Sequence, residues 1–336
     1  MNVVTDELVD RLRRLPKAEI HVHLEGCFER STLVDWAAEA NVPLPRPADR
    51  LFEFAGLADF LEFLDWASGL ASTTERLRQL AYEFCQRLAR DGTGYADLIV
   101  NPSHWAHWRN RIPEMIVALD AGFTKAEQEG LPPVGLCISI LRTQSAAEAE
   151  ALVALLITTK HPRVVALSID GNEAAAGRTG PRFASAFARA REMGLRRTVH
   201  AGESSGPEGV IDAIQLLQAD RIDHGVRAID DPAVVTMLAA DGIALGICPS
   251  SNVSLGVYPS IAAHPIDLLR RKGVRVSINT DDPSLLGTGL PLEYAKVIVA
   301  FDWDDATIRD VARTSIDASF APEGIKTALL KRLANW

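Results

Sequence analysis

The sequence contains few cysteines and no two of them at close spacing. The four, Cys27, Cys85, Cys137 and Cys248, are scattered along the chain without a Cys-x-x-Cys motif. A disulfide-stapled fold or a zinc site built from thiolates would need such pairs, so the pattern predicts neither. We expect all four cysteines to be small buried apolar side chains, with Cys27 and Cys248 close to strand ends.

Long apolar runs and concentrated positive charge are also missing. No apolar run approaches the roughly 20 residues that a helix needs to cross a bilayer, and the stretch 1–17 is too charged for a secretory signal. The formal net charge is −9, and lysine and arginine are spread along the chain, which disfavours nucleic-acid binding. These absences predict a cytoplasmic protein whose partner is a small molecule, not a membrane or a nucleic acid. We expect a monomer or a homodimer.

Short apolar runs of β-strand character alternate with longer stretches of helical spacing. The runs span residues 18–24, 95–101, 134–141, 164–170, 197–200, 221–224, 242–248 and 274–279. The clearest helical stretches span residues 146–159, 181–193, 208–217 and 232–240. A strand followed by a helix, repeated about eight times, is typical of a (β/α)8, or TIM, barrel. Because no linker or repeat divides the chain, we expect residues 1–336 to form one α/β domain.

The connection between the first and second runs, residues 28–93, is far longer than a single crossover helix requires. Its middle, residues 51–66, carries leucines and aromatic residues at close to i, i+3, i+4 spacing. We interpret the connection as a helical lid over the pocket, with most of its aromatic side chains packed against the barrel. Residues 104–108 (HWAHW) follow the second run, and we expect a loop-to-helix segment with one buried Trp and no catalytic role.

Histidines and an aspartate stand at the ends of the predicted strands, where such barrels build their sites. His21 and His23 are two residues apart in a strand, so both imidazoles point to the same side, into the barrel mouth. With His200 after the fifth run and Asp281 after the eighth, they form a nitrogen-rich set suited to zinc. The run 164–170 lacks the lysine that bridges two metals in binuclear barrel hydrolases. We therefore expect one Zn²⁺ per chain, with a bound water whose pKa falls to about 7.

Three further ionisable residues lie at strand ends around this set, namely Glu203, His224 and Asp282. Glu203, three residues after His200, is placed to donate a proton. His224 could accept the proton of the zinc-bound water or stabilise the hydroxide. Asp282 adjoins a predicted metal ligand and must point elsewhere, toward a hydrogen-bonding edge of the substrate. Each residue alone could be structural, but their joint placement favours a metal-dependent hydrolase.

Five motifs of this chain are specific when they occur together. They are LPKAEIHVHLEG (15–26), TVHAGE (198–203), RIDHG (221–225), CPSSN (248–252) and NTDDP (279–283). Together they resemble the adenosine and adenine deaminases of the amidohydrolase superfamily, over nearly the whole chain. The resemblance implies the same zinc ligands, and water adding to C6 of a 6-aminopurine with loss of ammonia. It implies that Glu203 protonates purine N1 and that His224 assists the attacking water. The substrate contacts that it implies come from His23, Glu25, Gly171 at N3 and Asp282 at N7.

Different motifs of the chain resemble deaminases that act on different substrates. Nucleoside deaminases commonly carry Asp where this chain has Glu25, and that Asp contacts the ribose 5′-hydroxyl. Glutamate at this position is similar to adenine and aminodeoxyfutalosine deaminases. The segments HAGESSGPE (200–208) and NTDDP are more similar to bacterial adenosine deaminases. We therefore expect adenosine or 2′-deoxyadenosine, with adenine or a modified adenine nucleoside such as aminodeoxyfutalosine as the alternative.

Other functional classes are distinguishable by sequence features. A base deaminase of the cytidine type would need a His-x-Glu and a Pro-Cys-x-x-Cys motif, and no Cys-x-x-Cys exists here. A mononuclear amidohydrolase acting on a lactone, ester or cyclic amide would keep the metal without needing the purine contacts of Glu203, Asp282 and Gly171. A non-catalytic binding protein is disfavoured, because such chains usually lose a metal ligand or the acid.

Overall fold

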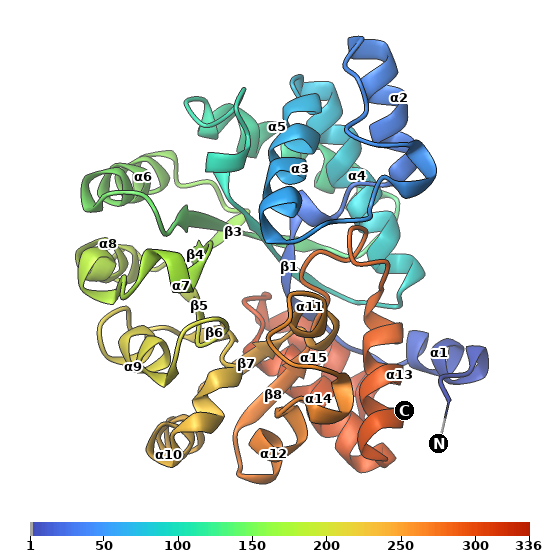
Figure 1. The fold of residues 1–336 in the computed structure, drawn as a ribbon, viewed down its shortest axis with the longest axis vertical. Helices are drawn as coiled ribbons and strands as arrows, with labels where there is room; N and C mark the ends of the chain where they lie inside the picture. Colours follow the sequence, from blue (N-terminus) through green and yellow to red (C-terminus); the bar gives the residue numbers. More distant parts are fainter. Residues whose placement is uncertain (1–2) are drawn as a thin grey trace.

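The computed structural model describes residues 3–336, except for the side chains of Leu57, Ala58 and Leu61. The first two residues of the predicted charged stretch 1–17 therefore lie outside the described part. Eight parallel strands lie side by side in chain order, β1 to β8, in a nearly closed barrel (Figure 1). The strands are β1 (Glu19–His23), β2 (Ala96–Val100), β3 (Val134–Leu141), β4 (Val164–Asp170), β5 (Arg196–Ala201), β6 (Arg221–His224), β7 (Ala244–Ile247) and β8 (Arg275–Ile278). The predicted barrel is confirmed, and each strand overlaps one predicted run.

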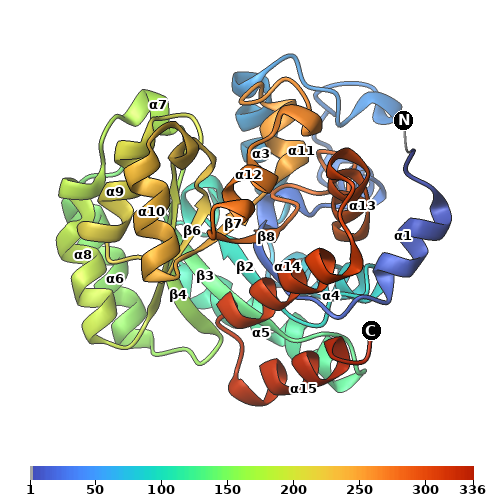
Figure 2. The same cartoon turned by 90° about the horizontal axis from the view of Figure 1, so that it is seen from below.

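Helices surround the strands (Figures 1 and 2). They are α1 (Asp6–Arg13), α2 (Arg30–Ala40), α3 (Leu57–Leu70), α4 (Thr74–Arg90), α5 (Ile112–Gln128), α6 (Ala146–Thr159), α7 (Glu173–Ala176), α8 (Gly180–Glu192), α9 (Pro207–Gln215), α10 (Pro232–Asp241), α11 (Pro249–Ser254), α12 (Ile266–Arg271), α13 (Leu290–Phe301), α14 (Asp305–Ala318) and α15 (Glu323–Leu333). The four predicted helical stretches correspond to α6, α8, α9 and α10. Within residues 3–336, no helix is long and apolar enough to cross a membrane.

Local sequence signals explain where several of these helices begin and end. At the start of α6, the hydroxyl of Ser145 accepts from the backbone N–H of Glu148 at 3.2 Å, and the Glu148 carboxylate accepts from the N–H of Ser145 at 2.8 Å. This reciprocal capping box satisfies two N–H groups that have no partner inside the helix. Helix α10 ends at Gly242, whose φ of 66° lies in the left-handed region that glycine adopts without strain. Helix bounds of this kind follow from the sequence alone.

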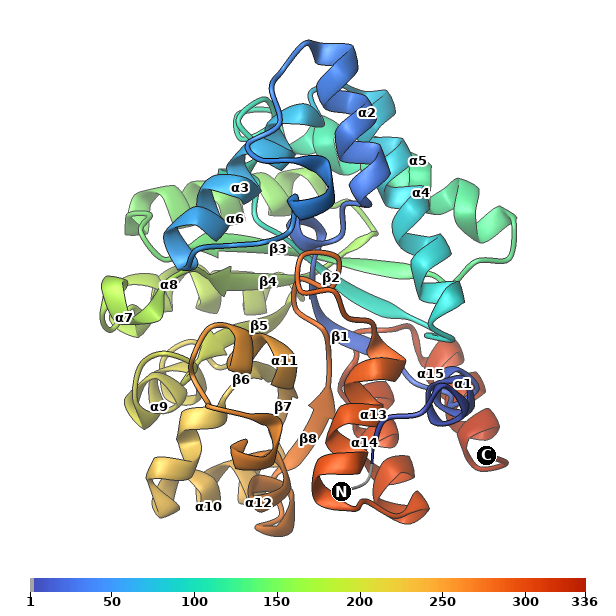
Figure 3. The ribbon, with the colours of Figure 1, turned by 45° about the vertical axis from the view of Figure 1, so that its right-hand side comes forward.

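The long connection between β1 and β2 contains three helices, α2, α3 and α4 (Figure 3). α4 packs against α5, as a crossover helix of the barrel does. α2 packs against α3, and α3 also contacts the short turns that follow β1 and β2, Leu24–Gly26 and Pro102–His104. α3 therefore lies at the carboxyl ends of these two strands. That the segment 28–93 acts as a lid stays a prediction.

The barrel closes between β1 and the residues that follow β8. Val22 pairs with Asp281 in an isolated parallel bridge. The N–H of His23 donates to the carbonyl of Asp281 at 2.8 Å, and the N–H of Asp281 donates to the carbonyl of His21 at 3.2 Å. Closure therefore occurs at the carboxyl ends of the strands, through the residues that the sequence marks as metal ligands.

The neighbouring strands β4 and β5 are held together differently. Their register pairs are Ala166 with Arg196 and Leu167 with Arg197, at the amino-terminal side of the ladder. Among the described residues, no ladder pair joins the later parts of the two strands. The carboxyl ends of β4 and β5 therefore depend on other contacts for their relative position.

A buried ion pair crosses the barrel interior. Arg221 and Asp97 are both fully buried, and Nη1 of Arg221 lies 2.7 Å from Oδ2 of Asp97. The guanidinium also stacks 4.3 Å from the ring centroid of Phe320, and its Nε lies 3.5 Å from Oδ1 of Asp223. Burial raises the pKa of the Asp97 carboxyl, and Arg221 opposes that rise. Such a pair holds its elements in one arrangement, because either charge alone would be very costly to bury.

Replacing Asp97 by Asn is expected to destabilise the fold. Removing one partner of a buried ion pair costs roughly 3–5 kcal/mol, and since Asp223 stays near Arg221 we expect about 3 kcal/mol. Urea unfolding measures the loss. The matched control is Asp305→Asn, which breaks a surface pair with Arg11 whose side chains are 39% and 54% exposed and should cost less than about 1 kcal/mol. Equal losses for the two variants would contradict this account of the buried pair.

Candidate active site

Three imidazoles and one carboxylate meet at the mouth of the barrel. Nε2 of His200 lies 3.1 Å from Nε2 of His21 and 3.0 Å from Nε2 of His23. Oδ1 of Asp281 lies 3.3 Å from His21 Nε2 and 3.4 Å from His23 Nε2. Ligand atoms of a tetrahedral zinc site with bonds of about 2.0–2.1 Å lie roughly 3.3 Å from one another. On the far side of its ring, His21 Nδ1 lies 2.8 Å from the carbonyl of Gly246, which leaves Nε2 free to bind a metal.

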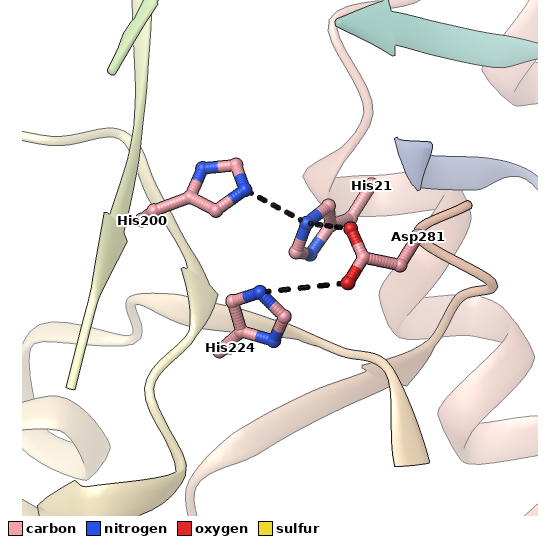
Figure 4. Close-up of side chains that lie close together, drawn as sticks. All are labelled: His21, His200, His224 and Asp281. Atoms are coloured by element: carbon pink, nitrogen blue, oxygen red, sulfur yellow. Dashed lines mark hydrogen bonds and ion pairs between the residues drawn. The ribbon is translucent and has the colours of Figure 1, made fainter. Parts of the chain in front are cut away.

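A fourth imidazole, that of His224, belongs to the same cluster. His21, His200, His224 and Asp281 offer ligand atoms that all lie within 4.8 Å of one another (Figure 4). Nε2 of His224 lies 3.8 Å from Oδ2 of Asp281, which is longer than the distances that His23 makes to the same carboxylate. The residues therefore fit a divalent metal ion, and the shorter spacing favours His23 over His224 as the third nitrogen ligand.

The backbone at two of these positions adopts an uncommon conformation. His224 has a φ of 63° and Asp281 a φ of 67°, in the left-handed region that residues with a side chain rarely occupy. Each such residue costs of order 1 kcal/mol and is kept where the surroundings determine it. Gly225, with a φ of 71°, continues the turn after His224. The turns aim both side chains into the cluster directly at the ends of their strands.

Two side chains of the CPSSN motif support the cluster from α11. The hydroxyl of Ser251 donates to Oδ2 of Asp281 at 2.6 Å. The side-chain amide of Asn252 lies 3.2 Å from Nδ1 of His224 and 3.4 Å from Oε1 of Glu203. The motif by itself predicted no role for these two residues. The signal was their position directly after a predicted strand, the same signal that identified the histidines.

Glu203 lies beside His224 in a buried environment. Its Oε1 is 3.4 Å from Nε2 of His224, and its side chain is 17% exposed. Burial, together with the negative charges of Asp281 and Glu173, raises the pKa of Glu203 to about 8. A carboxyl with this pKa carries a proton at neutral pH and can donate it. Burial and the charge of His21 hold the pKa of His224 well below its usual range, so that imidazole is neutral.

Asp282 lies next to Asp281 in the chain and is buried. That its carboxyl points toward a hydrogen-bonding edge of the substrate stays a prediction. Burial and the nearby carboxylates of Asp281 and Glu25 raise the pKa of Asp282 well above its usual range. The backbone of Gly26 approaches Asp282 so closely that a Cβ at Gly26 would lie 2.3 Å from Oδ1 of Asp282. Gly26 is therefore required for close packing of the turn after β1 against Asp282.

Glu25 is a buried carboxyl with one oxygen engaged and one free. Oε1 accepts from the N–H of Asn101 at 2.8 Å and from the indole N–H of Trp105 at 2.6 Å. Oε2 is buried without a partner among the described residues. Trp108 is also buried and donates to the carbonyl of Ala71 at 2.7 Å, so the prediction of one buried Trp in residues 104–108 was wrong. Alternation of polar and aromatic residues does not reveal that two indole N–H groups will both find buried acceptors.

A cavity of about 600 Å³ opens above the cluster. Its predicted site residues are His23, Glu25, Gly171, His200, Glu203, His224, Asp281 and Asp282. The other predicted ligand, His21, is fully buried beneath them. Phe52, Phe54, Phe60 and Leu64 of the connection between β1 and β2 also line the cavity, together with His104. The structure thus brings all the predicted site residues to one place.

Comparisons with known proteins agree with this arrangement. The family model for adenosine deaminase matches residues 16–336. An adenine deaminase from Agrobacterium fabrum is 35% identical over 332 residues, covering 96% of this chain and 98% of that protein. One from Cupriavidus taiwanensis is 33% identical over 329 residues, covering 96% and 92%.

Two solved structures match over almost their full length. The adenine deaminase of Arthrobacter aurescens has a TM-score of 0.90 at 26% identity, covering 96% of this chain and 99% of its own. An amidohydrolase from Burkholderia ambifaria with bound Zn has a TM-score of 0.91 at 25% identity, covering 99% and 93%.

The cluster of imidazoles with a carboxylate and the zinc-bound neighbour both indicate a divalent metal site. The family match extends from the first predicted strand to the end of the chain and includes every predicted site residue. This chain belongs to the adenosine deaminase family, and it is a hydrolytic deaminase.

Proposed function

We propose that the substrate is adenine, which the enzyme hydrolyses to hypoxanthine and ammonia. Local motifs favour adenosine with adenine as the alternative, and the names of the relatives support the alternative. The observation that carries the proposal is the free oxygen of Glu25, buried without a partner beside Trp105. Free adenine has an N–H at N9 that can pair with this oxygen, whereas a riboside carries carbon at N9. A buried polar atom left unpaired disfavours a ligand that cannot satisfy it.

The position of Glu25 relative to Asp282 supports this orientation. Both carboxyls line the cavity, and Gly26, the residue after Glu25, packs directly against Asp282. Purine N7 is a hydrogen-bond acceptor, and the raised pKa of Asp282 keeps the proton that it needs to donate there. N9 is two atoms further along the same ring edge, toward Glu25. Gly171, whose φ of 99° requires glycine, would present its backbone N–H to N3.

His21, His23, His200 and Asp281 would hold one Zn²⁺. When bound, zinc lowers the pKa of a water molecule to about 7 and so supplies hydroxide near neutral pH. His224 is neutral, and the NH₂ group of Asn252 faces its Nδ1, so the ring carries its proton on Nε2 and would stabilise the attacking hydroxide by donating to it. Glu203 donates its proton to N1, where negative charge accumulates as the C6 centre becomes tetrahedral. The proton of the hydroxyl on C6 then passes to the amino group, the C–N bond breaks, and ammonia leaves while C6 keeps a carbonyl oxygen.

A second substrate class is favoured by the size of the cavity. A volume of about 600 Å³ is in the range of sites for drug-sized ligands and exceeds what one nucleobase needs. The space next to Phe52, Phe54 and Phe60 could receive a group attached at N9. Adenosine or a modified adenine nucleoside is therefore the alternative to test beside adenine.

Ammonia release from a panel of purines tests the proposal. For the zinc-loaded enzyme we expect kcat/KM for adenine of about 10⁴ M⁻¹ s⁻¹ or more, well above the values for adenosine, 2′-deoxyadenosine, aminodeoxyfutalosine and N6-methyladenine. Chelation should abolish turnover and added Zn²⁺ should restore it. Preference for a nucleoside would overturn adenine as the substrate but keep the deaminase. No turnover of any member by fully zinc-loaded protein would move the substrate outside the 6-aminopurines.

Glu203→Gln is expected to lose turnover and keep its zinc. Gln has nearly the same shape but cannot transfer a proton to N1, and proton transfer of this kind contributes roughly 10²–10⁴-fold. Turnover and bound zinc are measured on the same preparation. Glu192→Gln, on the exposed surface of α8, is the control and should match the wild type. A Glu203→Gln variant within threefold of wild-type kcat would exclude the acid role.

Glu25→Asp is expected to raise the ratio of adenosine to adenine turnover. The substitution withdraws the carboxyl by one methylene, about 1.5 Å, which weakens the contact at N9 and makes room for a sugar. The ratio of the two kcat/KM values measures the effect. Glu29→Asp, a partly exposed residue on the same connection that pairs with Arg90, is the control. A ratio that does not change would remove Glu25 from the specificity argument.

A further inference from the structure

The carboxyl ends of β4 and β5 are joined by side chains in place of a strand ladder. Among the residues that the structure describes, their ladder pairs lie at residues 166–167 and 196–197, yet β4 leads to Gly171 and β5 leads to Glu203, which the proposed function brings to one purine. A cavity of about 290 Å³ lies beside the carboxyl end of β5, lined by Arg142, Glu173, His200 and others. Contacts other than ladder pairs must therefore fix the position of Glu203 relative to the end of β4.

Glu173, two residues after Gly171, reaches across the gap to the backbone of the segment 202–205. Its Oε1 accepts from the N–H of Gly202 at 2.9 Å, and its Oε2 accepts from the N–H groups of Glu203 at 3.0 Å and Ser205 at 3.2 Å. The Glu173 side chain is buried, with 4% of its surface exposed. A single carboxylate thus satisfies three backbone donors, one of them on the proposed acid itself.

Arg142, which follows β3, holds the end of β5 by donating to a backbone carbonyl. Its Nη2 donates to the carbonyl of His200, and its Nη1 donates to the hydroxyl of Thr179 at 2.7 Å. Arg142 is buried, and burial lowers the pKa of its guanidinium, while the charges of Glu173 and Asp170 oppose that change. Arg142 therefore fixes the strand end before the segment 202–205, and Glu173 fixes the segment itself.

The sequence around the segment is adapted to this contact. A Cβ at Gly209 would lie 2.5 Å from Oε1 of Glu173 and 2.9 Å from the hydroxyl of Ser205, so α9 can approach only because residue 209 is glycine. Gly202 has a φ of 62°, which turns the chain directly before Glu203. The segment makes its turn around the Glu173 carboxylate.

We propose that Glu173 is a positioning residue that places Glu203 by holding the backbone of residues 202–205. The proposal rests on the proposed role of Glu203 as the acid that protonates N1. An acid must lie within hydrogen-bond reach of the atom that it protonates, and a displacement of about 1 Å can cost roughly 10²-fold in rate. Glu173 would act on kcat through Glu203 without contacting the substrate.

Glu173→Gln tests the proposal, because Gln has the same shape but only one acceptor atom. At least one of the three N–H groups then faces an NH₂ group and moves away. We expect kcat for adenine to fall about 30-fold or more, with KM within threefold and zinc content unchanged. Asp267→Asn is the control. Asp267 is a buried carboxylate on α12, outside the site, and it accepts a hydrogen bond from the indole N–H of Trp303 at 2.8 Å. The control should lose stability but keep kcat.

A double variant separates positioning from general damage. In the Glu203→Gln background, Glu173→Gln should have little further effect on turnover, because the group that it positions is already gone. Additive losses would overturn the proposal. So would loss of zinc in parallel with kcat, or a rise in KM with kcat unchanged.

Amide hydrogen exchange at residues 202, 203 and 205 gives a readout that does not depend on turnover. Glu173→Gln should exchange faster there than the wild type and the Asp267→Asn control. If the wild type deaminates no purine but exchange at these amides is still faster in Glu173→Gln, the proposed function fails while the backbone contact stands. Unchanged exchange, in an enzyme that does deaminate adenine, overturns the positioning role alone.

Discussion

Two backbone hydrogen bonds between β1 and Asp281 are the constraint on which the site depends. They close the barrel, and they also set the distance between the histidines of β1 and the carboxylate that follows β8. The register that joins Val22 to Asp281 places Oδ1 of Asp281 within 3.4 Å of both His21 and His23. A shift of one residue would reverse the direction of every side chain in the strand. The contacts that close the barrel therefore also bring the residues of the metal site together.

Burial of many ionisable groups in this small space assigns their protonation states. Burial alone would raise the pKa of Asp281, but the surrounding imidazoles, above all His21, hold it well below its usual range. At Glu203 and Asp282 the charge of His21 also lowers the pKa, but burial and neighbouring carboxylates outweigh it, so both pKa values are raised. Pairs of groups whose pKa values are driven apart by their surroundings are what acid and base catalysis requires. The same pattern distinguishes a carboxylate that can bind a metal from carboxyls that can donate protons.

Residues that support the site were harder to predict than those at its centre. The histidines and carboxylates stand at the ends of apolar runs, and the period of a strand places His21 and His23 on one face. Ser251, Asn252 and Glu173 act through hydrogen bonds between segments that are distant in sequence, and their residue types are common in loops. The prediction that the substrate is adenosine rested on local motifs. Glu25, Trp105 and Asn101 are joined by two hydrogen bonds to Oε1 of Glu25, and they meet only in the folded chain.

The sequence by itself determined the alternation of strands and helices, the barrel, the ends of helices such as α6 and α10, and the set of residues able to bind a metal. These features depend on local periodicity, on capping residues and on the convergence of parallel strands at one end of a barrel. Only the tertiary structure decided that α3 lies over the first two strands, that β4 and β5 separate, and that Glu173 and Arg142 span the gap. Such contacts depend on packing between distant segments, where a side chain's partner is chosen by the three-dimensional path of the chain and not by its neighbours in sequence.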